Sequence, residues 1–271
     1  MSEAGRAQVP AIEFRELTRA FGRKSVLRGV NLVVPPGQTL TILGGSGSGK
    51  SVCLKHAIGL LRPDSGRVLV EGVDITGYTE RQLIAVRKNV SMVFQGAALF
   101  DSLDVYENVA YPLREHWRAS EAEIGDRVAR CLAAVGLPGV ERLLPAELSG
   151  GMRKRVGVAR AIALEPRVIL YDEPTTGLDP ANQRRIGELI RDLQRRLGVT
   201  SVVVTHELEL CFAVSDRVAL LKDGRIAAEG SADEMRESQH PAVRAFLEGI
   251  QDAANQDDPR EGVDGRFAPE G

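Results

Sequence analysis

The chain has 271 residues, of which 43% are hydrophobic and 27% charged, with a formal net charge of -2. This composition is typical of a globular protein long enough for one large domain or two smaller ones. The charge balance argues against a nucleic-acid partner, because proteins that bind nucleic acid usually carry a basic surface.

The apolar segments are short. Residues 1–14 show no basic stretch followed by an apolar one, so we expect no secretory signal. No apolar run approaches the roughly 18 residues that cross a bilayer, so we expect any membrane-spanning parts of the assembly in other chains. Three widely separated cysteines have no metal-ligand spacing, and we expect buried thiols in a reducing compartment: Cys53, Cys131 and Cys211.

Short β-rich runs alternate with helical patterns along the chain, which predicts an α/β fold. Thr39–Leu43 is expected as a buried strand, followed by a glycine-rich loop and a helix from about residue 50 to 61. A breaker cluster at 62–66 ends that helix. Further strands are expected at 68–71 and 90–94.

The glycine-rich loop has the P-loop pattern GxxxxGK[ST]. Its glycines let successive backbone N–H groups surround phosphate oxygens, and the next helix adds positive charge at its N-terminus. We assign Lys50 to the β- and γ-phosphates of ATP and the Ser51 hydroxyl to Mg²⁺. A flexible linker fits poorly, because the loop lies between two core elements. The residues assigned to the phosphates are Gly44, Gly45, Ser46, Gly47, Ser48, Gly49, Lys50 and Ser51.

Residues 97–165 show helical periodicity and few β-branched runs, which predicts a helical insertion into the α/β core. Near its end, Ser149 can cap a helix whose buried stripe begins at Met152. Gly150 and Gly151 leave that helix N-terminus bare, as a second anion site. Such a site is useful if it closes on a nucleotide held by another copy of the chain. The alternative is a capped helix with a tight glycine turn.

The expected strand at 168–171 ends in two carboxylates, Asp172 and Glu173. Downstream of a P-loop this pair is typical of a Walker B motif. Asp172 would hold Mg²⁺, and Glu173 would orient or deprotonate the attacking water. For this segment alone, a surface acidic pair is the alternative.

The last third of the chain predicts a helix from Asp179, its N-cap, to Gly198, then a strand at 199–205 and a hairpin at 218–228. From about Gly249 onward the chain becomes polar and acidic, and we expect a disordered tail. The apolar face of the helix is expected to comprise Ile186, Leu189, Ile190, Leu193 and Leu197.

These motifs occur in the order and spacing of ABC-type nucleotide-binding domains, which the chain resembles over roughly residues 12–248. The resemblance implies hydrolysis of ATP, with Mg²⁺, coupled to transport. It also implies an α/β fold with a P-loop NTPase (RecA-like) core, a parallel sheet and an antiparallel β subdomain. The core would occupy about 11–96 and 166–249, a helical subdomain about 97–165, and an acidic tail 250–271.

The resemblance assigns further site residues by position. Gln95 corresponds to the Q-loop residue that links Mg²⁺ and water to the transmembrane partner. Asp179 corresponds to the residue at the dimer seam, and His206 to the switch histidine that contacts the γ-phosphate. Phe21 resembles the adenine-stacking aromatic residue, usually a tyrosine, although a plain core role is the alternative.

Three segments are similar to the ATPase subunits of the Mla (maintenance of lipid asymmetry) phospholipid transporters and their relatives: 98–109, 148–180 and 240–247. Met152 stands where the family signature LSGGQ commonly has glutamine. The similarity implies a homodimer on the cytoplasmic face of a bacterial inner membrane, moving phospholipid between inner and outer membranes. Its implied partners are a permease, docking at residues 96–118, an MCE-domain lipid-binding protein and a STAS-domain protein. The apolar side chains of 96–118 could equally belong to the core.

Three alternatives remain open. The chain could serve a lipoprotein, amino-acid or drug transporter, since the shared motifs do not separate these systems. A soluble ABC ATPase acting on ribosomes or DNA usually has two cassettes or a long coiled-coil insertion, and this chain has neither. A regulatory module without turnover is disfavoured because Asp172, Glu173 and His206 complete the catalytic set.

Overall fold

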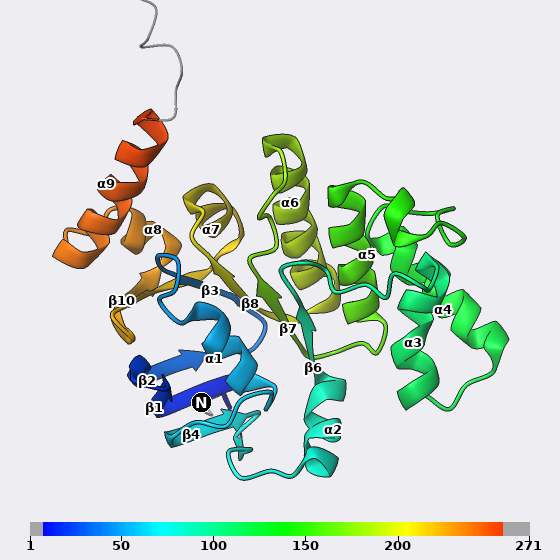
Figure 1. Ribbon diagram of the computed structural model, residues 1–271, viewed down its shortest axis with the longest axis horizontal. Helices are drawn as coiled ribbons and strands as arrows, with labels where there is room; N and C mark the ends of the chain where they lie inside the picture. Colours follow the sequence, from blue (N-terminus) through cyan, green and yellow to red (C-terminus); the bar gives the residue numbers. More distant parts are fainter. Residues whose placement is uncertain (1–7, 257–271) are drawn as a thin grey trace, which may run out of the picture.

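Two β-sheets form the centre of the computed structural model, which describes residues 8–256 (Figure 1). The larger sheet has six strands in the order β10-β9-β3-β8-β7-β6. Neighbouring strands from β9 to β6 run parallel, and β10 is antiparallel to β9. Its strands are β3 (Thr39–Leu43), β6 (Val90–Val93), β7 (Val168–Asp172), β8 (Thr200–Thr205), β9 (Arg217–Lys222) and β10 (Arg225–Ser231).

The central strands of this sheet are buried on both faces, which explains their continuous apolar sequences. In β7, Val168 and Leu170 pack into the core shared with α1 (Lys50–Ala57) and the smaller sheet. Ile169 and Tyr171 pack into the core on the other face, against the helical segment. The strand therefore holds its carboxyl end, where Asp172 lies, firmly between two cores.

The smaller sheet is antiparallel, with four strands in the order β2-β1-β4-β5. Neither β1 nor β2 is predicted from the sequence, because their apolar residues do not alternate regularly. The register of β1 shifts between Phe14 and Leu17, around Glu16, whose φ is 49°. Its strands are β1 (Ile12–Phe21), β2 (Lys24–Val34), β4 (Ser65–Val70) and β5 (Val73–Asp74).

Between β6 and β7 the chain forms helices, as the sequence predicted for residues 97–165. These helices lie together beyond β6, at the right of Figure 1. They are α3 (Val105–His116), α4 (Glu121–Ala134), the short 3-10 helix η1 (Pro145–Glu147) and α5 (Gly150–Ile162). The predicted fold class, an α/β core with a parallel sheet, an antiparallel sheet and a helical insertion, is confirmed.

Helix α6 (Pro180–Leu197) begins and ends as predicted. The Asp179 side chain accepts from the Asn182 N–H, and Gly198 closes the helix at φ 64°. The predicted apolar face is buried except at Leu197, which is 52% exposed because it lies in the last turn, past the sheet. The remaining helices are α2 (Glu80–Asn89), α7 (Leu208–Val214), α8 (Ala232–Arg236) and α9 (Pro241–Gln256).

Two predicted boundaries differ from the structure. Helix α1 stops at Ala57 rather than near residue 61, because Gly59 has a left-handed φ of 66° and ends the helical turn. Helix α9 continues to Gln256, beyond Gly249, where the acidic tail was expected to begin. The rest of that predicted tail, 257–271, lies outside the described residues. Within residues 8–256, none of the helices has the length and apolar character needed to span a membrane.

Candidate functional site

The P-loop joins β3 to α1 at the carboxyl end of the larger sheet. Two of its glycines have no room for a side chain. A Cβ at Gly44 would lie 2.5 Å from the Leu221 carbonyl oxygen, and one at Gly49 would lie 2.8 Å from the Leu27 side chain. Gly49 also has a φ of 106°, which disfavours other residues. The loop can therefore curl tightly enough to present its backbone N–H groups to an anion.

Lys50 lies buried inside the loop. Its Nζ donates to the carbonyl oxygens of Gly44, at 2.8 Å, and Gly45, at 3.1 Å. The same Nζ lies 3.2 Å from Glu173 Oε1. A buried ammonium held by carbonyl dipoles and one carboxylate supplies fixed positive charge where the sequence placed the β- and γ-phosphates.

Ser51 and Asp172 meet at the first turn of α1. The Ser51 hydroxyl donates to Asp172 Oδ1 at 2.6 Å. Burial raises the pKa of Asp172, while the Ser51 hydrogen bond opposes that rise. A buried carboxylate beside a hydroxyl is an oxygen donor pair of the kind that Mg²⁺ takes, so these residues fit the expected metal. Within residues 8–256, no hydrogen bond joins the exposed Gln95 side chain to this pair, so its assignment to Mg²⁺ stays a prediction.

Glu173 is held through both carboxylate oxygens. Oε1 faces Lys50, and Oε2 lies 3.0 Å from Nδ1 of His206. Its backbone N–H donates to the Val204 carbonyl, and its φ of 46° is left-handed. Such a conformation costs about 1–3 kcal/mol in a residue other than glycine, so surrounding contacts must impose it. The structure thus brings together Lys50, Ser51, Asp172, Glu173 and His206.

The signature segment lies elsewhere, at the start of α5. Ser149 caps this helix, accepting from the Met152 N–H at 3.2 Å, and Met152 packs against the core. A Cβ at Gly151 would lie 2.8 Å from Asn182 Oδ1, so this turn packs on the start of α6 beside Asp179. Among the described residues, no hydrogen bond or ion pair joins 149–151 to Lys50. Within one chain, this segment therefore makes no direct polar contact with the P-loop lysine.

Phe21 lies at the end of β1 and is 45% exposed, so the alternative of a core role is wrong. The Arg19 guanidinium lies 4.9 Å from its ring centroid. One ring face is therefore covered by a cation, and adenine stacking at this residue stays a prediction.

Two polar contacts beside the site involve residues that sequence reasoning did not assign. Lys154, on α5, is 8% exposed, and its ammonium donates to the backbone carbonyls of Gln95 and Glu173. Burial lowers its pKa, and the negative charge of Glu207, Asp172 and Glu173 opposes this. The one sequence feature that could have predicted this burial is the position of Lys154 among the apolar residues of that helix. Thr175 also donates to Glu207 Oε2 at 2.7 Å, anchoring the segment after His206.

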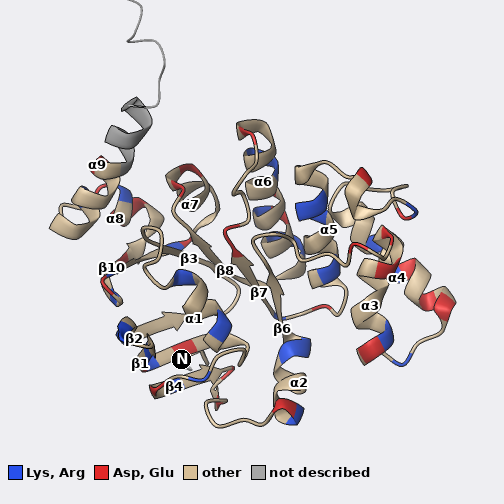
Figure 2. Cartoon of the chain, viewed as in Figure 1, with Lys and Arg blue, Asp and Glu red and all other residues tan. Residues whose placement is uncertain are grey.

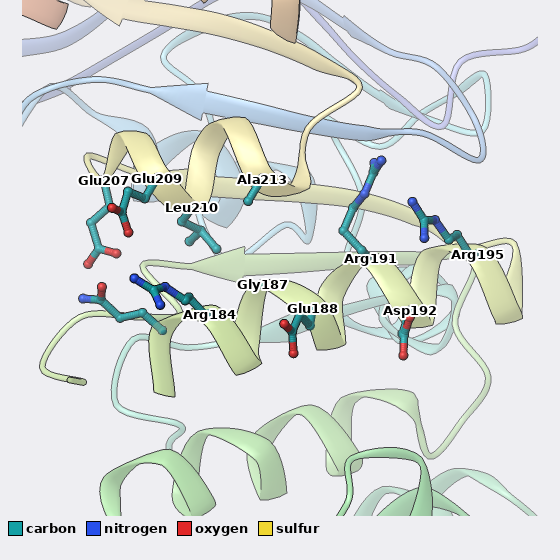
Figure 3. A pocket seen from close by; sticks show the side chains of 11 residues that line it. Arg184, Gly187, Glu188, Arg191, Asp192, Arg195, Glu207, Glu209, Leu210 and Ala213 are labelled. Atoms are coloured by element: carbon teal, nitrogen blue, oxygen red, sulfur yellow. The ribbon is translucent and has the colours of Figure 1, made fainter. Parts of the chain in front are cut away.

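Two cavities border this region. A groove of about 520 Å³ lies between α6 and α7 (Figure 3). It mixes basic and acidic side chains, including Arg184, Arg191, Glu188 and Glu209, so it has no clear preference for an anion. A second cavity, of about 460 Å³, is bordered by the P-loop, β2, the β9–β10 turn and α9. Of these two cavities, only the second is lined by residues of the P-loop.

Comparison with known proteins identifies relatives of this site and fold. The ABC transporter family model matches residues 27–176. The chain is 42% identical to the probable ribonucleotide transport ATP-binding protein Mkl of Mycobacterium tuberculosis, over 88% of this chain and 67% of that protein. It is 41% identical to the intermembrane phospholipid transport system ATP-binding protein MlaF of Escherichia coli K12, over 89% of this chain and 90% of that protein. Sequence identity to the Fe(3+) ions import ATP-binding protein FbpC 1 of Rhizobium meliloti is 45%, over 88% of this chain and 66% of that protein.

Solved structures agree with the fold. CbiO1 of Clostridium perfringens, part of the ABC transporter complex cbiONQ, superposes with a TM-score of 0.78 and 29% identity, over 91% of this chain and 98% of that one. A dimeric ATP-binding cassette in a post-hydrolysis state, bound to ADP and Pi, superposes with a TM-score of 0.75 and 32% identity. The match covers 82% of this chain and 98% of that one.

Proposed function

Because this chain belongs to the ABC transporter family of ATP-hydrolysing subunits, we propose that it powers phospholipid transport between the inner and outer membranes of a bacterium. The observation that carries this proposal is the match to MlaF, which spans 89% of this chain and 90% of that protein. Sequence identity to the iron-import protein is higher, at 45%, but the match spans only 66% of that protein. The second candidate is therefore an ABC transporter of another substrate: iron, a lipoprotein, an amino acid or a drug.

A permease is the partner proposed for the surface after β6. Phe100, Tyr111 and Trp117 each expose between 39% and 46% of their surface there. The Phe100 and Tyr111 rings pack together, with centroids 5.0 Å apart. A pair of large exposed aromatic side chains in contact, with a third exposed one at the end of α3, favours a protein partner over water. The subunit would bind the permease from the cytoplasmic face of the inner membrane, in a complex with an MCE-domain and a STAS-domain protein.

The separation of the two phosphate-binding halves supports a head-to-tail homodimer. In that dimer, each ATP lies between Lys50 of one copy and residues 149–151 of the other, with Asp179 at the seam. The dimeric cassette with bound ADP and Pi is consistent with such an arrangement. ATP then links the two copies, because its γ-phosphate contacts both.

The contacts of Lys50 and Glu173 suggest how binding prepares hydrolysis. When Lys50 turns to the phosphates, it releases Glu173 Oε1, and that oxygen can accept a proton from the attacking water. His206 keeps the other oxygen of Glu173 in place and reaches toward the γ-phosphate. Ser51, Asp172 and Gln95 would hold Mg²⁺, which neutralises phosphate charge during the reaction. Loss of phosphate then weakens the seam, and the opening reaches the permease through the Gln95 region.

The proposal is tested by tagging the chain, purifying it from its own membranes in detergent, and identifying the bound proteins and lipids. A permease, an MCE-domain protein and phospholipid are expected. A permease without lipid or a lipid-binding partner would refute phospholipid as the substrate. Ribosomes or nucleic acid without a membrane protein would refute transport.

The docking surface has a matched control. Replacing Phe100 and Tyr111 by serine should abolish recovery of the permease. Replacing Val73 by serine should leave recovery of the permease unchanged, because Val73 is similarly exposed but lies on the smaller sheet. Equal recovery from both variants would refute the aromatic surface as the permease contact.

A further inference from the structure

The segment that leaves β6 has an unusual backbone. Ala97 and Ala98 are consecutive and have φ values of 61° and 48°. Both lie in the left-handed region, which residues with a Cβ adopt only when their surroundings impose it. Ala97 is buried, and its N–H donates to the Phe94 carbonyl at 2.8 Å. This segment, residues 95–98, begins with Gln95 and leads to the aromatic surface.

Helix α5 holds this segment through its backbone carbonyls. The Lys154 ammonium donates to the Gln95 carbonyl. The Arg160 guanidinium donates to the carbonyls of Ala97 and Ala98, at 2.8 Å each. Between these cations, Gly157 lets Ala97 approach so closely that a Cβ on the glycine would lie 3.1 Å from the Ala97 Cβ. Basic residues recur along α5 (Figure 2), but these two face the segment 95–98.

The same face of α5 also contacts the catalytic end of β7. Lys154 donates to the Glu173 carbonyl at 3.4 Å, while being almost fully buried. Hydrogen bonds from a cation to backbone carbonyls are strong in such surroundings, and they do not depend on side chains in the segment they hold. Helix α5 begins at the signature turn, residues 149–151, which would bind the nucleotide of the second copy. The helix therefore connects that turn with both Gln95 and Glu173.

We propose that Lys154, Gly157 and Arg160 form a clasp that fixes residues 95–98, with Ala97 and Ala98 in the left-handed conformation, and makes this segment move with α5 when two copies close on ATP. Lys154 and Arg160 are positioning residues that act through Gln95 and Glu173. The proposal rests on the proposed function for the role of Gln95 and for the closure of two copies on ATP. The clasp itself can be measured without a permease or a lipid.

The first experiment follows hydrogen exchange of residues 94–99 in the full-length subunit. Lys154→Met should speed exchange of the Ala97 amide by about tenfold or more, because a charge-assisted bond to this segment is lost. Arg155→Met is the matched control. Arg155 is the next residue on α5, and its guanidinium donates to the carbonyls of Val135 and Gly136, away from the site. It should leave exchange at residues 94–99 unchanged.

The second experiment measures ATP hydrolysis by the same purified subunit. Lys154→Met should lower kcat by about tenfold or more, with KM for ATP changed less than about twofold, because the catalytic groups are displaced while the P-loop is intact. Lys154→Arg should restore most of the rate. Adding Ala98→Gly to Lys154→Met should recover part of it, because glycine adopts a φ of 48° without strain.

Wild-type exchange and wild-type kcat in Lys154→Met would overturn the clasp. Faster exchange with unchanged kcat would overturn its positioning role. If both effects appear in a protein that purifies without phospholipid, the clasp stands and the phospholipid proposal fails.

Discussion

Asn108 is the buried polar residue whose removal should most weaken the segment between Gln95 and α3. Its side chain is fully buried and makes four hydrogen bonds. Oδ1 accepts from the Phe100 N–H at 2.8 Å. Nδ2 donates to the carbonyls of Phe100, Leu103 and Asp104, at 3.0 to 3.1 Å. One amide therefore closes the loop that carries Phe100.

The expected effect of Asn108→Ala follows from which groups keep a partner. The Phe100 carbonyl still accepts from the Leu103 N–H, and the Asp104 carbonyl still accepts from the backbone N–H of residue 108. The Phe100 N–H and the Leu103 carbonyl lose the bonds that the amide provides. Both bonds are partly buried, so each group left without a partner costs about 1–2 kcal/mol and the free energy of unfolding should fall by about 2–4 kcal/mol.

Urea unfolding followed by far-ultraviolet circular dichroism measures this change on the purified chain. Asn89→Ala is the control, because Asn89 is exposed and its side chain makes only a 3.5 Å contact with the Ala85 carbonyl. It should change the free energy of unfolding by less than about 0.5 kcal/mol. If Asn108→Ala also stays within that limit, the reasoning from buried hydrogen bonds is wrong.

Four further predictions concern the site and the thiols. Lys50→Ala should abolish most ATP binding or hydrolysis, and near-normal turnover would refute the P-loop assignment. Glu173→Gln should bind ATP, hydrolyse it slowly and accumulate as a closed dimer; a variant that stays monomeric with ATP beside its membrane partners would contradict the shared site. Met152→Gln should keep ATPase activity, because Met152 packs against the core, and complete loss of activity would disprove this role. Burial raises the pKa of the Cys53 and Cys211 thiols to about 12, so a thiol reagent at pH 8 should label them only after urea unfolding, and rapid labelling of the native protein would contradict their burial.

The residues that meet at the P-loop were predictable because their placement follows from local rules. A strand, a glycine-rich turn and a helix place Lys50 and Ser51 together. Asp172 ends β7, and β8 lies between β7 and β3 on the parallel sheet. His206, assigned from the family resemblance, follows β8, so both residues reach the edge at which the P-loop lies. The sequence therefore predicts this cluster without knowledge of side-chain contacts.

The contacts around Lys154 were not predictable in this way. They join α5 to a segment that lies far from it along the chain, and only tertiary packing decides whether a helix cation turns inward or toward solvent. The same limit applies to Leu197, whose helical spacing fits the apolar face but whose position at the helix end leaves it exposed. Strand β1 was missed because its bulge near Glu16 breaks the two-residue period.

Phospholipid transport is tested most directly by reconstituting the purified complex in vesicles and following a labelled phospholipid to or from its lipid-binding partner. ATP should drive this movement in the wild type and not in the Glu173→Gln complex. Phospholipid in the vesicles should also stimulate ATP hydrolysis. ATP hydrolysis that proceeds at full rate without any lipid movement, in a complex that retains its permease, would contradict the proposed function.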